Sequence, residues 1–237
     1  MNRPLDVIVV GLGAHGVATF FQLARAGQRV LGIDQFHPPH RQGSSHGSSR
    51  ITRLAVGEGA AYVPLVQDSH RIWREIEART GQSIYHATGG LVMGPGDEAG
   101  SARSGASAPG GQGGPHGEVS DGAPGMARLR EPGFARNTIA IARACGIDHE
   151  VLDAAGIARR FPAFRLHGDE VGYFEPEAGY VRPERAIELQ LALGREAGGE
   201  LRVDEAGVAI EPRGGGAGVT VRTATGRFEA DRVVLAT

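Results

Sequence analysis

The 237-residue sequence predicts an α/β fold, and three observations support this prediction. A short run rich in β-branched residues, Leu5–Val10, leads directly into the glycine turn GLGAHG, and an apolar-patterned helix follows over about 14–26. A second strand pattern, 28–33, ends in Asp34. Strand, glycine turn, helix and strand together form the context in which a GxGxxG match indicates a dinucleotide site.

Glycine is needed at each of three positions in this turn, for a different physical reason at each. Gly11 permits the tight turn off the strand, Gly13 lets the backbone approach a pyrophosphate, and Gly16 allows close packing of helix on strand. Asp34 is placed to accept hydrogen bonds from the hydroxyls of an adenosine ribose, and it would repel a 2′-phosphate. We therefore expect FAD or NAD rather than NADP. The alternative is a strand–helix–strand unit without a ligand.

The polar segment that follows, PPHRQGSSHGSSRITR, is unusually long for the connection to a next helix. Its small residues would let the backbone lie against a flat ring, and Arg50 and Arg53 could project toward anions. From these residues alone, a solvated basic loop is an equal alternative.

Beyond this segment, the apolar patterns predict alternating elements. The expected helices are 62–79, 134–145, 153–160 (with Asp153 as N-cap) and 183–197, and the expected strands are 84–93, 149–152, 171–174, 201–210, 219–223 and 232–236. The stretch 94–125 is rich in Gly, Ser, Ala and Pro and cannot offset its ordering entropy by burial. We expect a flexible insertion over about 97–133.

Composition narrows the class of partners. The formal net charge is −2, which provides no basic field for nucleic acid or anionic membrane, so small molecules are the expected partners. No apolar run is long enough to span a bilayer, and the N-terminus lacks a signal-peptide pattern. The single cysteine, Cys145, is expected to be a small buried residue, and a cytoplasmic location is expected. All 25 basic residues are Arg, which excludes lysine chemistry from this chain.

Several segments together carry a family resemblance. The sequences VIVVGLGAHG, DQFHPPHRQGSSHGSSRITRLAVGEGAAYVPL, TGGLVMGP, GYFEPEAGYVRPE and VVLAT resemble the N-terminal half of the monomeric sarcosine oxidase and N-methyltryptophan oxidase family. These are flavin amine oxidases of the D-amino-acid oxidase structural group. The resemblance implies a Rossmann-like FAD-binding domain, residues 1–84 and 182–237, with an interleaved, incomplete α+β substrate domain at 85–181.

The resemblance also implies which residues form the cofactor and substrate site. The cofactor bound there would be FAD, and no metal is expected. The implied cofactor-binding residues are Gly11, Gly13, Gly16, Asp34, Ser44, Ser45, His46, Ser49 and Arg50. Ser49 and Arg50 would lie beside the isoalloxazine ring, Arg53 would face the substrate carboxylate, and Glu58 would neutralise or orient Arg53. Arg50, Arg53 and Glu58 are thus the expected catalytic residues.

The implied reaction oxidises the C–N bond of an N-methyl amino acid with oxygen, giving formaldehyde, the demethylated amino acid and hydrogen peroxide. The family's flavin-linking cysteine and oxygen-activating lysine belong to its C-terminal half, and the apolar strand VVLAT stops one residue short of the family's Ala-Thr-Gly. We therefore expect an inactive or partial fragment of a monomeric enzyme. The alternatives are another flavoenzyme of the group, of glycine oxidase or amino-acid dehydrogenase type, or a degenerate nucleotide-binding remnant.

Overall fold

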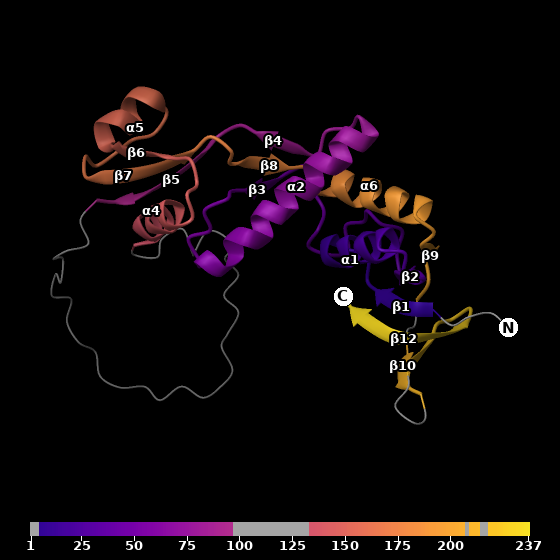
Figure 1. Cartoon of the computed structure of the whole chain (residues 1–237). Helices are drawn as coiled ribbons and strands as arrows, with labels where there is room; N and C mark the ends of the chain where they lie inside the picture. The colour runs from indigo at the N-terminus through magenta and orange to yellow at the C-terminus, as the bar shows by residue number, and fades with distance from the viewer. Residues whose placement is uncertain (1–4, 97–132, 207–208, 214–217) are drawn as a thin grey trace, which may run out of the picture. The chain divides into compact units, whose positions relative to one another are not determined.

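The computed structural model describes residues 5–96, 133–206, 209–213 and 218–237, and the chain divides into two compact units (Figure 1). Unit 1 comprises Met1–Thr52, Ser69–His86 and Tyr180–Thr237, and unit 2 comprises Arg53–Asp68 and Ala87–Gly179. The expected flexible insertion lies outside the described residues, except for Gly133. The α/β fold class predicted from the sequence is confirmed.

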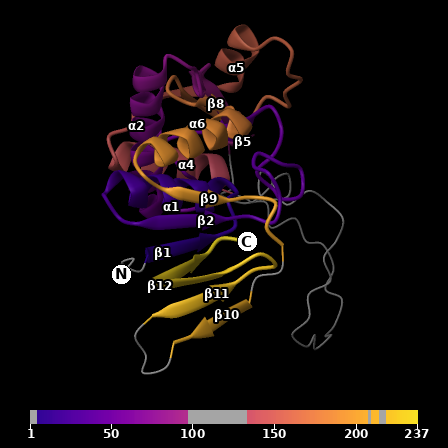
Figure 2. The ribbon, with the colours of Figure 1, turned by 90° about the vertical axis from the view of Figure 1, so that its right-hand side faces the viewer.

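Unit 1 is built on a six-stranded sheet with the order β10-β11-β12-β1-β2-β9, as Figure 2 shows. Its strands are β1 (Leu5–Val10), β2 (Val30–Ile33), β9 (Glu200–Arg202), β10 (Ala209–Pro212), β11 (Val219–Arg222) and β12 (Arg227–Leu235). The pairs joining β12, β1, β2 and β9 are parallel, and β10 and β11 extend the sheet in antiparallel fashion. The parallel strands end near the glycine turn, so this edge is where a ligand would bind.

Strand β1 is buried on both faces over Val7–Val10, which explains the apolar run at these four positions. Val7 and Val9 pack with helices α1 (Ala14–Arg25) and α6 (Pro183–Glu196), while Ile8 and Val10 belong to a second cluster with β2 and β11. Phe20 of α1 is fully buried, and its ring would collide with a Cβ at Gly194 or Gly199. Small residues in and after α6 therefore allow the two helices to pack closely.

The rest of unit 1 centres on residues 69–80 of the long helix α2 (Val63–Thr80). The first part of this helix, 63–68, and the preceding 3₁₀ turn η1 (Ala60–Tyr62) belong to unit 2. Ile76 packs in a cluster with Phe21 and Ile84, and Trp73 lies against this cluster. A small sheet has the order β3 (Arg50–Thr52), β8 (Gly179–Val181) and β4 (Tyr85–Ala87). Strands β3 and β8 were not expected, because three-residue runs carry little periodicity.

Unit 2 contains an antiparallel sheet with the order β5 (Gly90–Pro95), β7 (Glu170–Glu175) and β6 (Glu150–Asp153). Helices α4 (Phe134–Ala144) and α5 (Ala154–Arg160) belong to the same unit. Asp153 caps α5, since its Oδ1 accepts a hydrogen bond of 2.7 Å from the Gly156 amide. This is the N-cap that the sequence predicts.

Two expected strands are each divided in the structure. The pattern at 84–93 forms β4 and β5, separated at Gly89, whose φ of +77° and close approach to Phe174 exclude a side chain. The pattern at 201–210 forms β9 and β10, which lie at opposite edges of the six-stranded sheet. Asp204, with a φ of +58°, turns the chain between them.

The structure adds two observations. Residues 53–68 fall within the range expected for the FAD-binding domain, 1–84, and by packing they group with unit 2, because Ala55 and Val63 pack in the core beside Tyr173. Cys145 is exposed rather than buried. The helix ends at Ala144, and Ile147 enters the core in its place.

Among the residues that the structure describes, no helix has the length and apolar character needed to cross a membrane.

Candidate functional site

The glycine turn after β1 is compact because two of its positions have no room for a side chain. Gly11 has a φ of +88°, and a Cβ there would lie 2.7 Å from the Ala236 carbonyl oxygen. A Cβ on Gly16 would lie 1.7 Å from the Gly11 carbonyl oxygen. Both glycines are thus required by the turn itself, before any ligand is considered.

The start of α1 is suited to an anion. Gly13 is the N-cap and offers no side chain, and the first turn contains no acidic residue. The Ser45 Oγ accepts a hydrogen bond of 3.0 Å from the Ala14 amide, and a Cβ on Gly13 would approach that hydroxyl to 3.3 Å. A helix N-terminus with an uncrowded backbone attracts phosphate through its free amides and its dipole.

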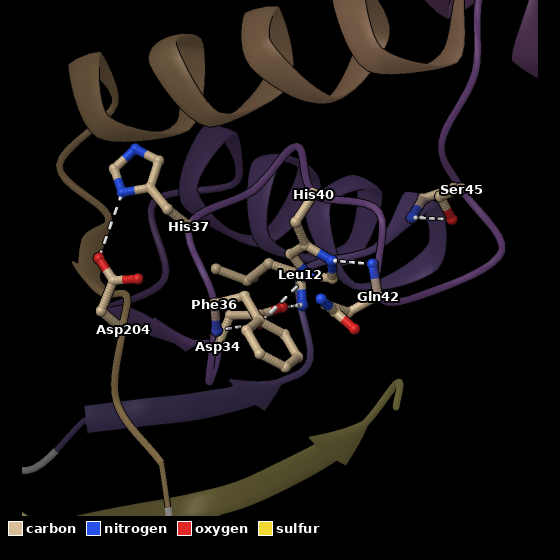
Figure 3. A network of polar contacts seen from close by, with 9 residues as sticks. Leu12, Asp34, Phe36, His37, His40, Gln42, Ser45 and Asp204 are labelled. Carbon is tan, nitrogen blue, oxygen red and sulfur yellow. Dashed lines mark hydrogen bonds and ion pairs between the residues drawn. The ribbon is translucent and has the colours of Figure 1, made fainter.

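Asp34, at the end of β2, is nearly buried and joins the ends of the first two strands (Figure 3). Its Oδ2 accepts a hydrogen bond of 2.6 Å from the Leu12 amide, and its Oδ1 accepts one of 2.9 Å from the Phe36 amide. Because an ionised carboxylate has about four acceptor positions, two remain for ribose hydroxyls. Asp34 therefore has a structural role in addition to the expected binding role.

His40 lies beside this carboxylate. Its Nδ1 accepts a hydrogen bond of 3.2 Å from the Gln42 amide, so Nε2 carries the hydrogen (Figure 3). The Nε2 atom is buried and 3.3 Å from the Asp34 Oδ1, but within the described part of the chain it makes no well-directed hydrogen bond. A buried donor of this kind is available to an incoming acceptor.

These groups border a cavity of about 380 Å³ in unit 1. The volume lies within the range of small-molecule sites. Its lining residues are Val10, Gly11, Gly13, Ala14, His15, Ile33, Asp34, Gln35, Phe36, His40, Gln42, Gly43, Ser44, Ser45, Ala236 and Thr237. A glycine turn, a helix N-terminus and a carboxylate in one cavity fit the adenosine and pyrophosphate of a dinucleotide.

The predicted cofactor residues divide into two groups. Gly11, Gly13, Asp34, Ser44 and Ser45 line the cavity. The other four do not, and these are Gly16, His46, Ser49 and Arg50. Gly16 instead shapes the turn, as described above.

Arg50 cross-links the loop that precedes it. Its guanidinium donates hydrogen bonds to the carbonyl oxygens of Ser44 (2.9 Å), His46 (2.5 Å) and Ser49 (2.8 Å). The side chain expected to face an anion thus holds the loop in shape through its backbone. Carbonyl pairing leaves the positive charge of Arg50 without a neutralising carboxylate among the described residues.

Arg53 and Glu58 form the ion pair that the resemblance implies. The Arg53 Nη2 donates to the Glu58 Oε2 at 2.9 Å, and the guanidinium lies over the Phe134 ring, 5.5 Å from its centroid. The Arg53 side chain is 23% exposed, and its Nε is buried without a hydrogen-bond partner among the described residues. One carboxylate and one aromatic face therefore fix the guanidinium and leave other N–H donors available.

Glu175 and Tyr173 are buried polar residues that the sequence analysis did not single out. The Glu175 carboxylate is completely buried and accepts hydrogen bonds from the Leu54 amide (2.6 Å), the Ala55 amide (3.1 Å) and the Tyr173 hydroxyl (2.6 Å). Burial raises the pKa of Tyr173, and the neighbouring carboxylate raises this pKa further. The sequence contains one signal that could have identified this pair: Tyr173 and Glu175 are two residues apart, which places both side chains on one face of β7.

Comparisons with known proteins agree with this geometry. The family model described as DAO, FAD dependent oxidoreductase, matches residues 6–237. The chain is 36% identical over 238 residues to a monomeric sarcosine oxidase from Streptomyces avermitilis, covering 99% of this chain and 52% of that protein. It is 32% identical over 230 residues to an N-methyl-L-tryptophan oxidase from Salmonella arizonae, covering 97% of this chain and 52% of that protein.

Solved structures share the fold. NikD, an amino acid oxidase of nikkomycin biosynthesis, superimposes with a TM-score of 0.71 at 28% identity, over 99% of this chain and 51% of that chain. The L-proline dehydrogenase from P. horikoshii superimposes with a TM-score of 0.72 at 18% identity, over 100% of this chain and 54% of that chain. At this identity the likeness shows the fold alone. The chain spans about half the length of the curated relatives it matches. By its match over nearly all residues, the chain belongs to the DAO family of FAD-dependent oxidoreductases.

Proposed function

We propose that the chain is an FAD-dependent amine oxidase, or a part of one, that acts on N-methyl amino acids of the sarcosine or N-methyltryptophan type. The observation that carries the FAD part is the cavity at the glycine turn, bordered by Gly13 and Asp34. The N-methyl amino acid class rests on similarity to two kinds of oxidase with these names. The reaction would consume the N-methyl amino acid, oxygen and water, and release formaldehyde, the demethylated amino acid and hydrogen peroxide.

In this proposal the cavity holds the adenosine and pyrophosphate of FAD. Gly13 and the α1 N-terminus would receive the pyrophosphate, and Asp34 would accept the ribose hydroxyls. Ser44 and Ser45 would complete the lining, with their loop held in shape by Arg50. When bound, FAD supplies the two-electron acceptor for oxidation of the C–N bond.

Arg53 would bind the carboxylate of the amino-acid substrate. A guanidinium presents several N–H donors in one plane, which suits a carboxylate better than a point charge does. Glu58 takes one donor of this group, and the Phe134 ring covers one side. Because both contacts restrict the guanidinium, less entropy is lost when the substrate binds. A cytoplasmic, monomeric enzyme is part of this proposal.

FAD titration of the purified chain, followed by the change in flavin fluorescence, tests the cofactor site. Gly13→Ala places a Cβ where Ser45 Oγ and the incoming pyrophosphate need space, so FAD affinity should fall, and Gly13→Val should abolish it. Gly94→Ala is the matched control, since its Cβ would make an ordinary 3.5 Å contact with Ala135 in unit 2. Equal affinity in wild type and Gly13→Val would show that the phosphates bind elsewhere.

A further inference from the structure

The segment that follows β3 is held by a side chain from a distant part of the chain. Strand β3 ends at Thr52, so the amides of Leu54 and Ala55 lie beyond its bounds. The Glu175 carboxylate, more than a hundred residues away in sequence, accepts a hydrogen bond from each of these two amides. Charge-assisted hydrogen bonds of this kind are stronger than neutral ones, so the two peptide units are firmly fixed.

This carboxylate is part of the core. Glu175 is completely buried, and a carboxylate at such a place requires hydrogen-bond donors on both oxygens. Two backbone amides and the Tyr173 hydroxyl provide them. The positive charge of Arg53 lowers the pKa of Tyr173, against the larger effects of burial and of Glu175, so the guanidinium interacts electrostatically with the same cluster.

The residue directly before the fixed peptide units is Arg53. Its guanidinium contacts Glu58 and the Phe134 ring, and both contacts depend on where the Arg53 backbone lies. Rotation of the Leu54 peptide would displace the arginine from both partners at once. Holding the following two amides therefore restricts the guanidinium without touching it.

We propose that Glu175 is the positioning residue for Arg53: its carboxylate fixes the Leu54 and Ala55 amides and thereby holds the guanidinium against Glu58 and Phe134. The inference deepens the proposed function, because it rests on Arg53 as the group that binds the substrate carboxylate. Glu175 touches neither substrate nor cofactor in this role. It acts by reducing the conformational freedom of Arg53.

The arginine Nε–H resonances in a ¹H–¹⁵N NMR spectrum test this directly. The Arg53 resonance is assigned by its loss in Arg53→Met, and it should exchange slowly with water because its Nε is buried. Glu175→Asp retains the charge but is too short to reach both amides, and Glu175→Gln turns one acceptor into a donor. In both variants the Arg53 Nε–H should exchange at least about tenfold faster, as expected for loss of local protection.

Two controls separate positioning from general loss of packing. Glu150→Gln removes an exposed carboxylate of unit 2 that pairs with Arg160, and it should leave the Arg53 resonance unchanged. Tyr173→Phe retains both amide hydrogen bonds of Glu175 and should also preserve slow exchange. Unchanged exchange in both Glu175 variants would overturn the proposal. Loss of the folded spectrum in both would overturn it too, since Glu175 would then determine the stability of the whole unit.

A second experiment tests carboxylate binding by Arg53 independently of its positioning by Glu175. Acetate titrated into the FAD-saturated chain should shift the Arg53 resonance, and Glu175→Asp should weaken the apparent acetate affinity about tenfold, equivalent to about 1.4 kcal/mol. Absence of any acetate effect in the wild type would refute carboxylate binding by Arg53. The exchange experiment would still decide whether Glu175 positions this side chain.

Discussion

Replacement of Asp34 by Asn should destabilise unit 1 as well as weaken FAD binding. Each carboxylate oxygen accepts one backbone amide, from Leu12 and from Phe36, in a nearly buried position. Asn has one oxygen, so one amide would face an NH₂ group and lose its acceptor, at a cost of about 1–3 kcal/mol. The remaining hydrogen bond would become neutral and lose about 1 kcal/mol more. Together these terms predict a loss of about 3 kcal/mol in the free energy of unfolding.

Urea unfolding followed by tryptophan fluorescence measures this change. The chain has one tryptophan, Trp73, which packs against a core cluster of unit 1. Asp204→Asn is the matched control: the Asp204 carboxylate is 70% exposed and pairs with an exposed His37 at 3.5 Å, so its loss should cost at most about 1 kcal/mol. If the two variants unfold at the same urea concentration, the hydrogen bonds of Asp34 do not stabilise the unit.

Two other predictions concern the loop and the stability in acid. Arg50→Lys should speed amide hydrogen exchange over 44–49 severalfold, because one ammonium cannot span the carbonyls that Arg50 joins; Arg41→Lys, in the same segment, should not. Hydrogen bonds from Thr223 and Thr225 lower the pKa of Glu205 below 4.5. The stability that these hydrogen bonds add is full above pH 4.5 and is lost as the pH falls through the lowered pKa. The free energy of unfolding, measured from pH 7 to 3, should therefore fall more steeply in wild type than in Glu205→Gln. Equal exchange in the two arginine variants, or parallel pH curves for Glu205→Gln and wild type, would contradict these predictions.

Much of the fold around the glycine turn could be predicted from local sequence. Strand β1, the glycine turn, helix α1 and strand β2 appear close to the expected bounds, because a buried parallel strand, an amphipathic helix and a left-handed glycine each leave a signal within a few residues. The membership of the DAO family, inferred from motifs, is confirmed. The position of Asp34 at the end of β2 could also be predicted, since the length of the helix between the two strands sets where β2 ends.

Tertiary structure decided the features that depend on distant partners. The division of 201–210 into two strands follows from pairing at opposite edges of one sheet, which local alternation does not encode. Arg50 was expected to face a ligand, and only the folded loop brings three carbonyl oxygens within its reach. Glu175 meets the amides of Leu54 and Ala55 across 121 and 120 residues. A buried carboxylate is stable only where donors converge on it, and that convergence arises from the packing of unit 2 rather than from any pattern along the chain.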